Sequence, residues 1–524
     1  MNKKQKNIIL LVFVLFIAIT LRLIRIGRYD FWYDEAINIF NSQCFFDFDF
    51  IRKLISNGMF PPFVYSIFLG AWKTFGNSEF ILRISSVIIN LFSLTCVFFF
   101  TRKFFDNKTA IFSIFMLMLS PLQIYYAQEL SVYSLYGLLS AVSYYLYFLS
   151  LKNKESIIIP AVFLTNICVF YVHPMSMLLV FTQTCALIFI KKYNSLLKQW
   201  CFFLLVYLFL TLPFFRYVFL DKNFFIINSV WSPKPGLENA LCTFYDLIFG
   251  YNASAVTYIV GVLLLVFLLI RGALKSLIQF KEKGYLLCYT IILPLISLFV
   301  FSRIIFGLSG KSVYVHRYLI FIAPFLSIIL AKGLEFKSRK TTVILSVIFV
   351  IIITSNLFNY YNNRFPLPEN PYRTGVHARK DFKSLIEFLK SRIPKDTPIV
   401  HNARITSAPF LYYQNNYFNK ILYLNTSSTP ITVPGKCPFF IFNSKKSSLL
   451  DNFSFIERQT LFSNCERFWL IFSDWDQPRN GLFSEFPFDN KLDWRGMILE
   501  KYSLVYHRKF TGIDLYYFVF KNKH

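Results

Sequence analysis

Two neighbouring carboxylates, Asp34 and Glu35, are the residues of this chain best suited to proton-transfer chemistry. They follow the aromatic run Phe31–Tyr33, a few residues after the first long apolar stretch. Acidic residues are scarce, 28 against 55 basic ones, and a charge close to a bilayer is costly unless it serves a function. A carboxylate at the membrane surface can deprotonate the hydroxyl of an arriving acceptor. The alternative is that Asp34 caps an amphipathic helix through about residue 45 and favours its dipole.

A third carboxylate, Glu129, ends the segment Ser120–Glu129 and is predicted to lie on the same side of the membrane as the first pair. The alternative for Glu129 is an ordinary interfacial carboxylate. A phosphate-bearing substrate on that side would need cations, and the candidates are Arg83, Arg303, Lys311 and Arg317. Arg317 could hold a phosphate through two nitrogens, or it could be a snorkelling interfacial anchor. His173 is better suited to a local hydrogen bond than to catalysis or metal binding.

The elements that must position these groups are membrane helices. The chain has 524 residues, of which 55% are hydrophobic and 20% aromatic, and its apolar runs of roughly 18 to 22 residues predict a polytopic helical membrane protein. The net charge of +27 could suggest nucleic-acid binding. The basic residues, however, fall in short gaps between apolar runs, which is typical of cytoplasmic loops, so no nucleic-acid partner is expected.

Eleven membrane helices are predicted, at about residues 7–26, 84–101, 109–127, 131–150, 156–172, 174–190, 199–217, 251–270, 285–303, 317–332 and 341–358. The first is interpreted as an uncleaved helix with its N-terminus inside the cell. Five gaps on one side of the membrane are then all basic, whereas the opposite gaps hold Asp34, Glu35 and Glu129. This topology predicts a multi-pass protein of the cytoplasmic (inner) membrane with its C-terminus outside.

The chain is predicted to have two domains. Residues 1–358 form the transmembrane domain, in which residues 27–83 are a first outer loop with interfacial helices. The apolar segment Pro61–Phe75 is interpreted as one such helix, and a short spanning helix is the alternative. Residues 359–524 alternate short β-prone runs with a helical stretch and predict a small mixed α/β domain outside the cell. Cys437 and Cys465 in that domain could pair if it is exported, which the sequence alone leaves open.

Four motifs, in order along the chain, resemble those of the bacterial polytopic GT-C glycosyltransferases of family 39 type, relatives of protein O-mannosyltransferases and of lipid A aminoarabinose transferases. The motifs are Tyr33-Asp34-Glu35-Ala36, Pro61–Tyr65 with Phe75–Arg83, Ser120–Glu129 with Tyr133-Ser134-Leu135, and Arg317-Tyr318-Leu319 with Ala323-Pro324. The resemblance covers about residues 7–335, while the C-terminal domain resembles nothing that we can name.

The resemblance implies an inverting transfer of a sugar from a polyprenyl-phosphate donor to the hydroxyl of a lipid, glycan or protein acceptor on the outer face of the membrane. Asp34 matches the family's catalytic acidic position, and Glu35 and Glu129 would shape the pocket. Further substrate-pocket candidates are Tyr33, Gln128, Tyr133, His173 and His316.

The chain departs from the family's pattern at two places. Ser131 stands where the family often has arginine, so Arg83 or Arg317 would have to supply that cation. Met59-Phe60 stands where some relatives carry Lys or His, so no cofactor is predicted with certainty and a divalent metal, although possible, has no support. A transporter or flippase of lipid-linked glycans and a non-catalytic envelope scaffold are the alternative functions.

Overall fold

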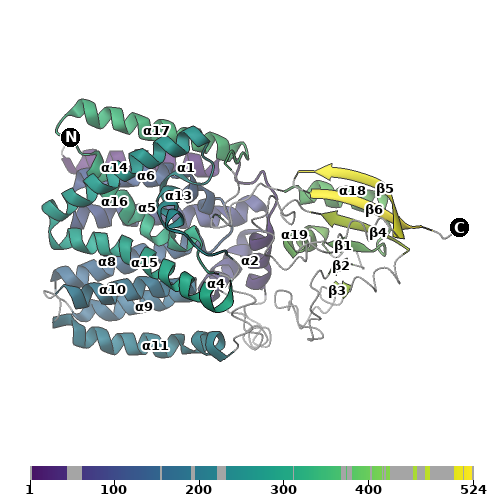
Figure 1. The fold of residues 1–524 in the computed structure, drawn as a ribbon, viewed down its shortest axis with the longest axis horizontal. Helices are drawn as coiled ribbons and strands as arrows, with labels where there is room; N and C mark the ends of the chain where they lie inside the picture. Colours follow the sequence, from purple (N-terminus) through teal and green to yellow (C-terminus); the bar gives the residue numbers. More distant parts are fainter. Residues whose placement is uncertain are drawn as a thin grey trace. The chain divides into compact units, whose positions relative to one another are not determined.

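The structure is a computed structural model (Figure 1). It describes residues 3–43, 62–153, 156–190, 195–220, 232–310, 312–367, 373, 380–401, 404–415, 417, 421–424, 453–456, 466–472, 501–511 and 513–521. The chain divides into two compact units. The first, which we call the membrane unit, comprises residues 1–26, 62–68 and 75–377, and the second, the α/β unit, comprises residues 27–61, 69–74 and 378–524.

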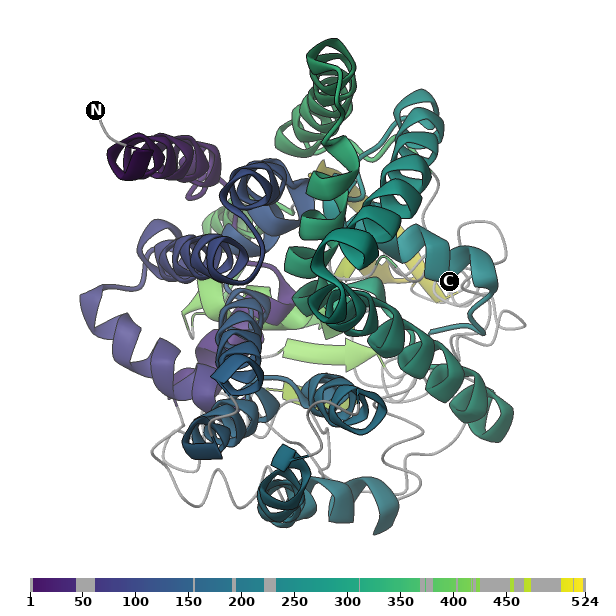
Figure 2. The same ribbon diagram turned by 90° about the vertical axis from the view of Figure 1, so that its left-hand side faces the viewer.

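Long apolar helices build the membrane unit, and several are seen end-on, side by side, in Figure 2. In chain order its elements are α1 (Lys3–Leu23), α5 (Glu79–Phe104), α6 (Asn107–Leu119), α7 (Pro121–Ala127), α8 (Tyr133–Asn153), η2 (Ser156–Ile158), α9 (Ile159–Phe170), η3 (Pro174–Ser176), α10 (Met177–Phe189), α11 (Leu197–Leu220), α13 (Leu237–Phe249), α14 (Ala255–Phe280), α15 (Glu282–Ser309), η6 (His316–Ile322), α16 (Ala323–Leu334) and α17 (Arg339–Tyr361). Helix α4 (Phe63–Trp72) and η1 (Lys73–Phe75) are divided in sequence between the two units, with residues 69–74 in the second.

The helices confirm the predicted polytopic class. Among the described residues, seven helices are long and apolar enough to cross a membrane, one bent pair (α6 with α7) adds an eighth, and shorter apolar helices lie at Ile9–Leu23, Ile159–Phe170 and Pro174–Phe189. These segments coincide with the predicted ranges. Helix α4 has 10 residues, too few to span a bilayer, as expected for the Pro61–Phe75 segment.

One predicted helix, 109–127, is broken. Helix α6 ends at Leu119 and α7 begins at Pro121, with a bend of 64° between them. The cause is local, because Pro121 has no N–H to continue the helical ladder and Ser120 caps the new helix by accepting the Gln123 N–H at 3.5 Å.

Three of the five predicted basic gaps meet at one end of the membrane unit. The buried Lys332 ammonium lies 2.7 Å from Asp106 Oδ2 and 3.0 Å from Glu335 Oε2. Arg271 donates to the Gly333 carbonyl at 3.1 Å, and Lys283 donates to the Phe104 carbonyl at 3.1 Å. The gaps after α5, α14 and α16 therefore share one side, as the charge pattern predicts, while the assignment of that side to the cytoplasm stays a prediction.

Two kinds of packing fix the helices inside this unit. A closed ring of hydrogen bonds joins α8, α9 and α10: Ser143 donates to Asn166 at 2.5 Å, Asn166 to Gln183 at 2.9 Å, and Gln183 back to Ser143 at 3.0 Å. Helices α14 and α16 instead meet at glycines. A Cβ at Gly272 would lie 1.9 Å from the Ile329 carbonyl oxygen, so only glycine permits this backbone approach.

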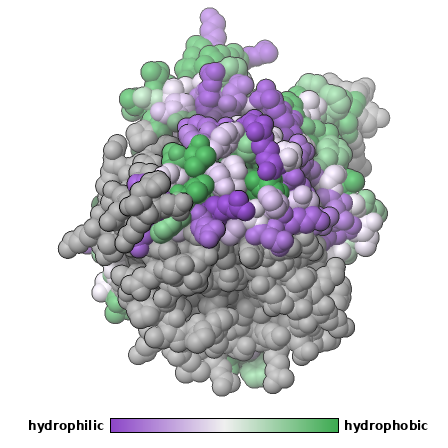
Figure 3. All heavy atoms as spheres, turned by 90° about the vertical axis from the view of Figure 1, so that its right-hand side faces the viewer, coloured by the Kyte–Doolittle hydropathy of each residue, from purple (hydrophilic) through white to green (hydrophobic). Residues whose placement is uncertain are grey.

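The α/β unit contains a mixed sheet in the order β3-β2-β1-β4-β6-β5, which confirms the predicted class for the C-terminal part. Strands β1 (Ile399–His401), β2 (Ile421–Leu424), β3 (Phe453–Ile456) and β4 (Arg467–Phe472) pair in parallel, whereas β6 (Ile513–Phe520) runs antiparallel to β4 and to β5 (Tyr502–Phe510). The described side chains on the face of this unit seen in Figure 3 are largely hydrophilic. Cys437 and Cys465 lie outside the described residues.

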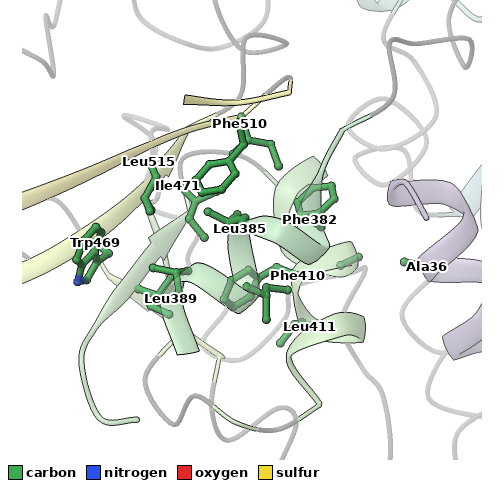
Figure 4. Packing of buried hydrophobic residues seen from close by; sticks show 14 of the residues in the cluster. Ala36, Phe382, Leu385, Leu389, Phe410, Leu411, Trp469, Ile471, Phe510 and Leu515 are labelled. Carbon is green, nitrogen blue, oxygen red and sulfur yellow. The ribbon is translucent and has the colours of Figure 1, made fainter. Parts of the chain in front are cut away.

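Helices α18 (Phe382–Arg392) and α19 (Arg404–Gln414) pack on this sheet, and helix α2 (Tyr33–Gln43) joins their core. Leu385, Phe410 and Leu515 are fully buried there, and Ala36 of α2 faces the same cluster (Figure 4). Two hydrogen bonds secure the approach to α2, from Lys383 N–H to Asp30 Oδ2 at 2.7 Å and from Phe31 N–H to the Tyr413 hydroxyl at 2.7 Å. The segment before α2 therefore groups with residues 378–524. The domain boundaries 1–358 and 359–524 stay a prediction.

Candidate functional site

A fully buried carboxylate, Asp246, lies at the centre of an ion cluster in the membrane unit. His316 Nδ1 lies 2.5 Å from Asp246 Oδ2. The Arg373 guanidinium contacts both carboxylate oxygens: Nε lies 2.9 Å from Oδ2, and Nη2 lies 2.8 Å from Oδ1. Asp246 is in the last turn of α13, where the helix dipole disfavours a negative charge. The arginine offsets that cost, since a buried charge needs a partner.

The charges of this cluster follow from its partners. Burial alone would lower the pKa of the Arg373 guanidinium, but Asp246 raises it above its ordinary value, so Arg373 is positively charged at neutral pH. Arg373 thus balances the charge of the Asp246 carboxylate, and the His316 ring nitrogen Nδ1 adds a short hydrogen bond to it at 2.5 Å.

The second group surrounds Arg317, the residue that follows His316 on η6. The Arg317 guanidinium lies 5.2 Å from the centre of the Tyr133 ring. The His173 ring lies 5.5 Å from that of Tyr133, 5.2 Å from that of Tyr136 and 5.0 Å from that of Tyr318. Three predicted residues from distant parts of the sequence, Tyr133, His173 and Arg317, are thus brought together.

His173 has the local role that the sequence favoured. Its Nδ1 accepts the Met175 N–H at 3.3 Å and so caps η3. Burial and the nearby Arg317 charge lower the pKa of His173 to about 3, so the ring is neutral at pH 7. It serves as a flat aromatic wall rather than as a second cation.

Tyr251 connects the two groups. The Arg373 guanidinium lies 5.7 Å from its ring centre. Burial raises the pKa of Tyr251, and nearby charges also act on it, Asp246 upward and Arg317 and Arg373 downward. Tyr251 thus links the two groups electrostatically.

Two further predicted residues, Gln128 and Glu129, belong to the segment that connects α7 and α8. Glu129 is fully buried there, three residues after Tyr126, whose ring lies 4.6 Å from that of Tyr133. Gln128 has an anchoring position: its Nε2 donates to the Arg22 and Ile24 carbonyls, each at 2.8 Å, and its Oε1 accepts the Tyr360 hydroxyl at 2.6 Å. Gln128 therefore ties together the ends of α1, α7 and α17.

The other predicted cations have different surroundings. Arg83, which is 1% exposed, donates to the Ile26 carbonyl at 2.9 Å and holds the end of the first helix. Arg303 is exposed on α15 and donates to the Pro235 carbonyl at 3.1 Å. Lys311 lies outside the described residues.

The predicted residues of the first motif belong to the α/β unit. Glu35 is buried and accepts the Trp32 N–H at 3.2 Å, which is how a glutamate at the third helical position caps a helix. Tyr33 packs against the hydrophobic cluster of this unit, and Asp34 is partly exposed in the first turn of α2. The capping role considered for Asp34 is thus filled by its neighbour Glu35.

Sequence reasoning missed Asp246, Tyr251 and Arg373. Helix α13 is short and lies between two predicted spans, and Asp246 and Arg373 are 127 residues apart, so no local pattern joins them. One signal was available: Asp246 is an acidic residue in a strongly apolar stretch, which in a membrane protein points to a partner and a role. Within the described part of the chain, no three His, Cys, Asp or Glu side chains are grouped in a way that could hold a metal ion.

Comparison with known proteins identifies the fold. No protein-family model and no curated protein matches the chain. Among solved structures, ArnT from Cupriavidus metallidurans bound to undecaprenyl phosphate has a TM-score of 0.55 at 11% identity and covers 97% of each chain, and its apo state gives 0.56 at 11% identity over 98% of each chain. The oligosaccharyltransferase AglB from Archaeoglobus fulgidus, in complex with an inhibitory peptide and a dolichol-phosphate, gives 0.46 at 11% identity over 79% of this chain and 64% of that chain. The likeness to ArnT shows that this chain has the GT-C fold.

Proposed function

We propose that this protein is a membrane glycosyltransferase that moves a sugar from a polyprenyl-phosphate donor to an acceptor hydroxyl, with inversion at the anomeric carbon. The observation that carries the proposal is the similarity of nearly the whole chain to ArnT, whose structure holds undecaprenyl phosphate. The cationic and aromatic centre around Arg317 supports it, because a lipid-linked phosphate needs positive charge and a sugar ring packs well on aromatic faces.

The reaction is a single displacement. The acceptor oxygen attacks the anomeric carbon on the side opposite the phosphate, and the new carbon–oxygen bond forms as the bond to the phosphate oxygen breaks. The bonding electron pair leaves with the polyprenyl phosphate, and a base takes the hydroxyl proton. The phosphate is a good leaving group, so the protein must mainly supply a cation for it and a base for the acceptor.

Arg317 is our choice for the cation that meets the phosphate. Its guanidinium lies 5.2 Å from the Tyr133 ring, and the His173 ring lies near those of Tyr133 and Tyr318, so aromatic faces surround the cation. Glu129, buried in the link before α8, would shape the same pocket, together with Tyr133 and His173. Arg83, Arg303 and Lys311 remain alternative phosphate ligands, and His316 and Gln128 would line or support the pocket.

Asp34 is proposed as the base on the strength of its motif, Tyr33-Asp34-Glu35-Ala36. Glu35 and Tyr33 would position it, since both are fixed by packing at the start of α2. We assign the reaction to the outer face of the cytoplasmic membrane, with the C-terminal α/β part extracytoplasmic, because basic gaps that meet at one end of the membrane unit are typical of cytoplasmic loops. The acceptor is a lipid, a glycan or a protein.

The test is a transfer assay with the full-length protein in lipid nanodiscs. A panel of labelled polyprenyl-phosphate sugars is mixed with an envelope extract, and transfer by the wild type is compared with transfer by Asp34→Asn. The matched control is Asp381→Asn, which changes a carboxylate that caps α18 by accepting the Ser384 N–H at 3.1 Å. We expect label to move into the extract with the wild type and Asp381→Asn, and at least 100-fold more slowly with Asp34→Asn.

Two outcomes would contradict separate parts of the proposal. Equal transfer by folded Asp34→Asn would keep the enzyme and remove Asp34 as base. Absence of transfer with every donor, in protein that also fails to bind polyprenyl phosphate, would argue against the transferase and favour a transporter or scaffold.

A further inference from the structure

We infer that Arg373, held in place by Asp246, is a second phosphate-binding cation that acts together with Arg317. This inference rests on the proposed function, because it assigns a role toward the same lipid-linked phosphate. It concerns a residue that follows α17 and that the sequence motifs do not include.

The geometry places the two arginines around one anchor. Asp246 holds Arg373 directly and holds His316 through Nδ1 at 2.5 Å, and His316 is the residue before Arg317 in the chain. A single buried carboxylate therefore fixes one arginine and the backbone neighbour of the other.

Arg373 retains hydrogen-bonding capacity beyond this ion pair. It uses Nε and Nη2 on the carboxylate, which is one edge of the planar guanidinium. Arginine has five N–H donors, and among the described residues none engages Nη1 or the far side of Nη2, so these donors can meet another anion. The side chain is 10% exposed, and the rings of Tyr251 and Tyr258 lie 5.7 and 5.6 Å from its centre, so its orientation is set before a ligand arrives.

The reaction itself gives a reason for two cations. A polyprenyl-phosphate sugar is a phosphodiester with one negative charge, whereas the departing polyprenyl phosphate is a monoester with two. The second charge develops as the bond to the sugar breaks. A cation that meets this developing charge lowers the barrier more than it tightens donor binding, so Arg373 should affect kcat more than KM for the donor.

A purely structural ion pair is the competing explanation, in which Arg373 only neutralises Asp246. The two explanations differ for the double variant D246N/R373Q, which removes both charges and leaves two neutral groups of similar shape. Thermal stability should then recover toward the wild-type value in either case. Affinity for a dianionic phosphate recovers only if the pair is structural.

The experiment measures binding of radiolabelled undecaprenyl phosphate to the full-length protein in nanodiscs, with undecaprenol as the uncharged control lipid. The variants are R373Q, D246N/R373Q and, as a matched control, R364Q, an exposed arginine of the same segment after α17. We expect R373Q and the double variant to weaken binding at least tenfold, and R364Q to change it less than twofold. Where a sugar donor is known, R373Q should lower kcat more than tenfold with a smaller change in KM.

The outcomes separate this inference from the proposed function. Wild-type affinity in R373Q, or restored affinity in the stable double variant, would overturn the role of Arg373 and leave the transferase intact. If the wild type binds undecaprenyl phosphate no better than undecaprenol, the lipid-phosphate donor itself is wrong and the inference falls with it. If R373Q does not fold, the binding affinity of the double variant D246N/R373Q for undecaprenyl phosphate decides between the two explanations.

Discussion

Replacing Gly272 by alanine tests the tightest helix contact of the membrane unit. The added Cβ would lie 1.9 Å from the Ile329 carbonyl oxygen and 3.0 Å from the Gly333 nitrogen, whereas ordinary contact begins at 3.4 Å. The helices would therefore have to separate by about 1.5 Å at this point. Both obstacles are backbone atoms of α16, which cannot rotate away as a side chain would.

The expected cost follows from that geometry. Overpacking a core typically lowers the free energy of unfolding by about 1–3 kcal/mol. Because the obstacle here is backbone, we expect a loss near the top of that range, about 3 kcal/mol. Helix α16 continues directly from η6, which carries Arg317, so a displaced α16 should also slow sugar transfer. The converse substitution, Gly333→Ala, meets the Leu268 carbonyl oxygen at 2.3 Å and should behave similarly.

The assay is unfolding by SDS titration in mixed micelles, followed by helix content, with transfer measured on the same samples. The matched control is Gly307→Ala in α15, where an added Cβ meets nothing within 4 Å. That substitution should be neutral or stabilise by up to about 1 kcal/mol through helix propensity. If Gly272→Ala were as stable as Gly307→Ala, the close approach of α14 and α16 would be refuted, together with the reasoning built on it.

Three further predictions concern other parts of the membrane unit. Arg317→Gln should reduce transfer about 30- to 1000-fold, or about 2–4 kcal/mol, because it removes a cation that meets developing charge, and Arg317→Lys should recover part of it in steady-state kinetics. Asn166→Leu opens the hydrogen-bonded ring of α8–α10 and should cost about 1–2 kcal/mol in SDS titration. Asp106→Asn should destabilise more at pH 7 than at pH 3. Burial raises the pKa of Asp106, yet Lys332 and Thr109 bring it below its usual 3.8, so its contribution is present above that pH and is lost as the pH falls further.

Each of the three has a result that would count against it. Normal transfer by Arg317→Gln would move the phosphate site to Arg83, Arg303 or Lys311. Wild-type stability in Asn166→Leu would mean that the ring contributes specificity of packing rather than free energy. An equal loss at pH 3 and pH 7 in Asp106→Asn would point to helix capping, through the Thr109 N–H, instead of charge.

Much of the helical half of the molecule could be predicted because membrane helices leave long, local hydropathy signals. The segments coincide with the predicted ranges, and contacts of Lys332, Arg271 and Lys283 bring three of the five basic gaps together. Prediction failed where a local feature of the sequence outweighed the hydropathy signal. Pro121 divides a run that hydropathy alone presents as one helix, and α13 was missed because it is short and amphipathic.

The candidate site was harder to predict for a physical reason. Tyr133, His173 and Arg317 could be nominated one at a time from type and position, but their proximity depends on how α8, η3 and η6 pack. The pairing of Asp246 with Arg373 could not be predicted, because no sequence pattern in either segment indicates contact with the other. The sequence also did not distinguish Asp34 from Glu35 as the capping residue, since both suit the first turn of a helix and only packing buries one of them.

The shortness of α9 has a consequence for the lipid around the protein. Its 12 residues rise about 18 Å, and even with the preceding turn of η2 the segment falls short of a hydrocarbon layer of about 30 Å. Such hydrophobic mismatch is relieved when the bilayer thins locally or when interfacial side chains reach outward. Beside α9 the head groups would therefore be drawn inward, toward the end of the helix where His173 and Tyr133 meet. A lipid-linked phosphate approaching from this side would travel a shorter distance through hydrocarbon than it would beside α14 or α15.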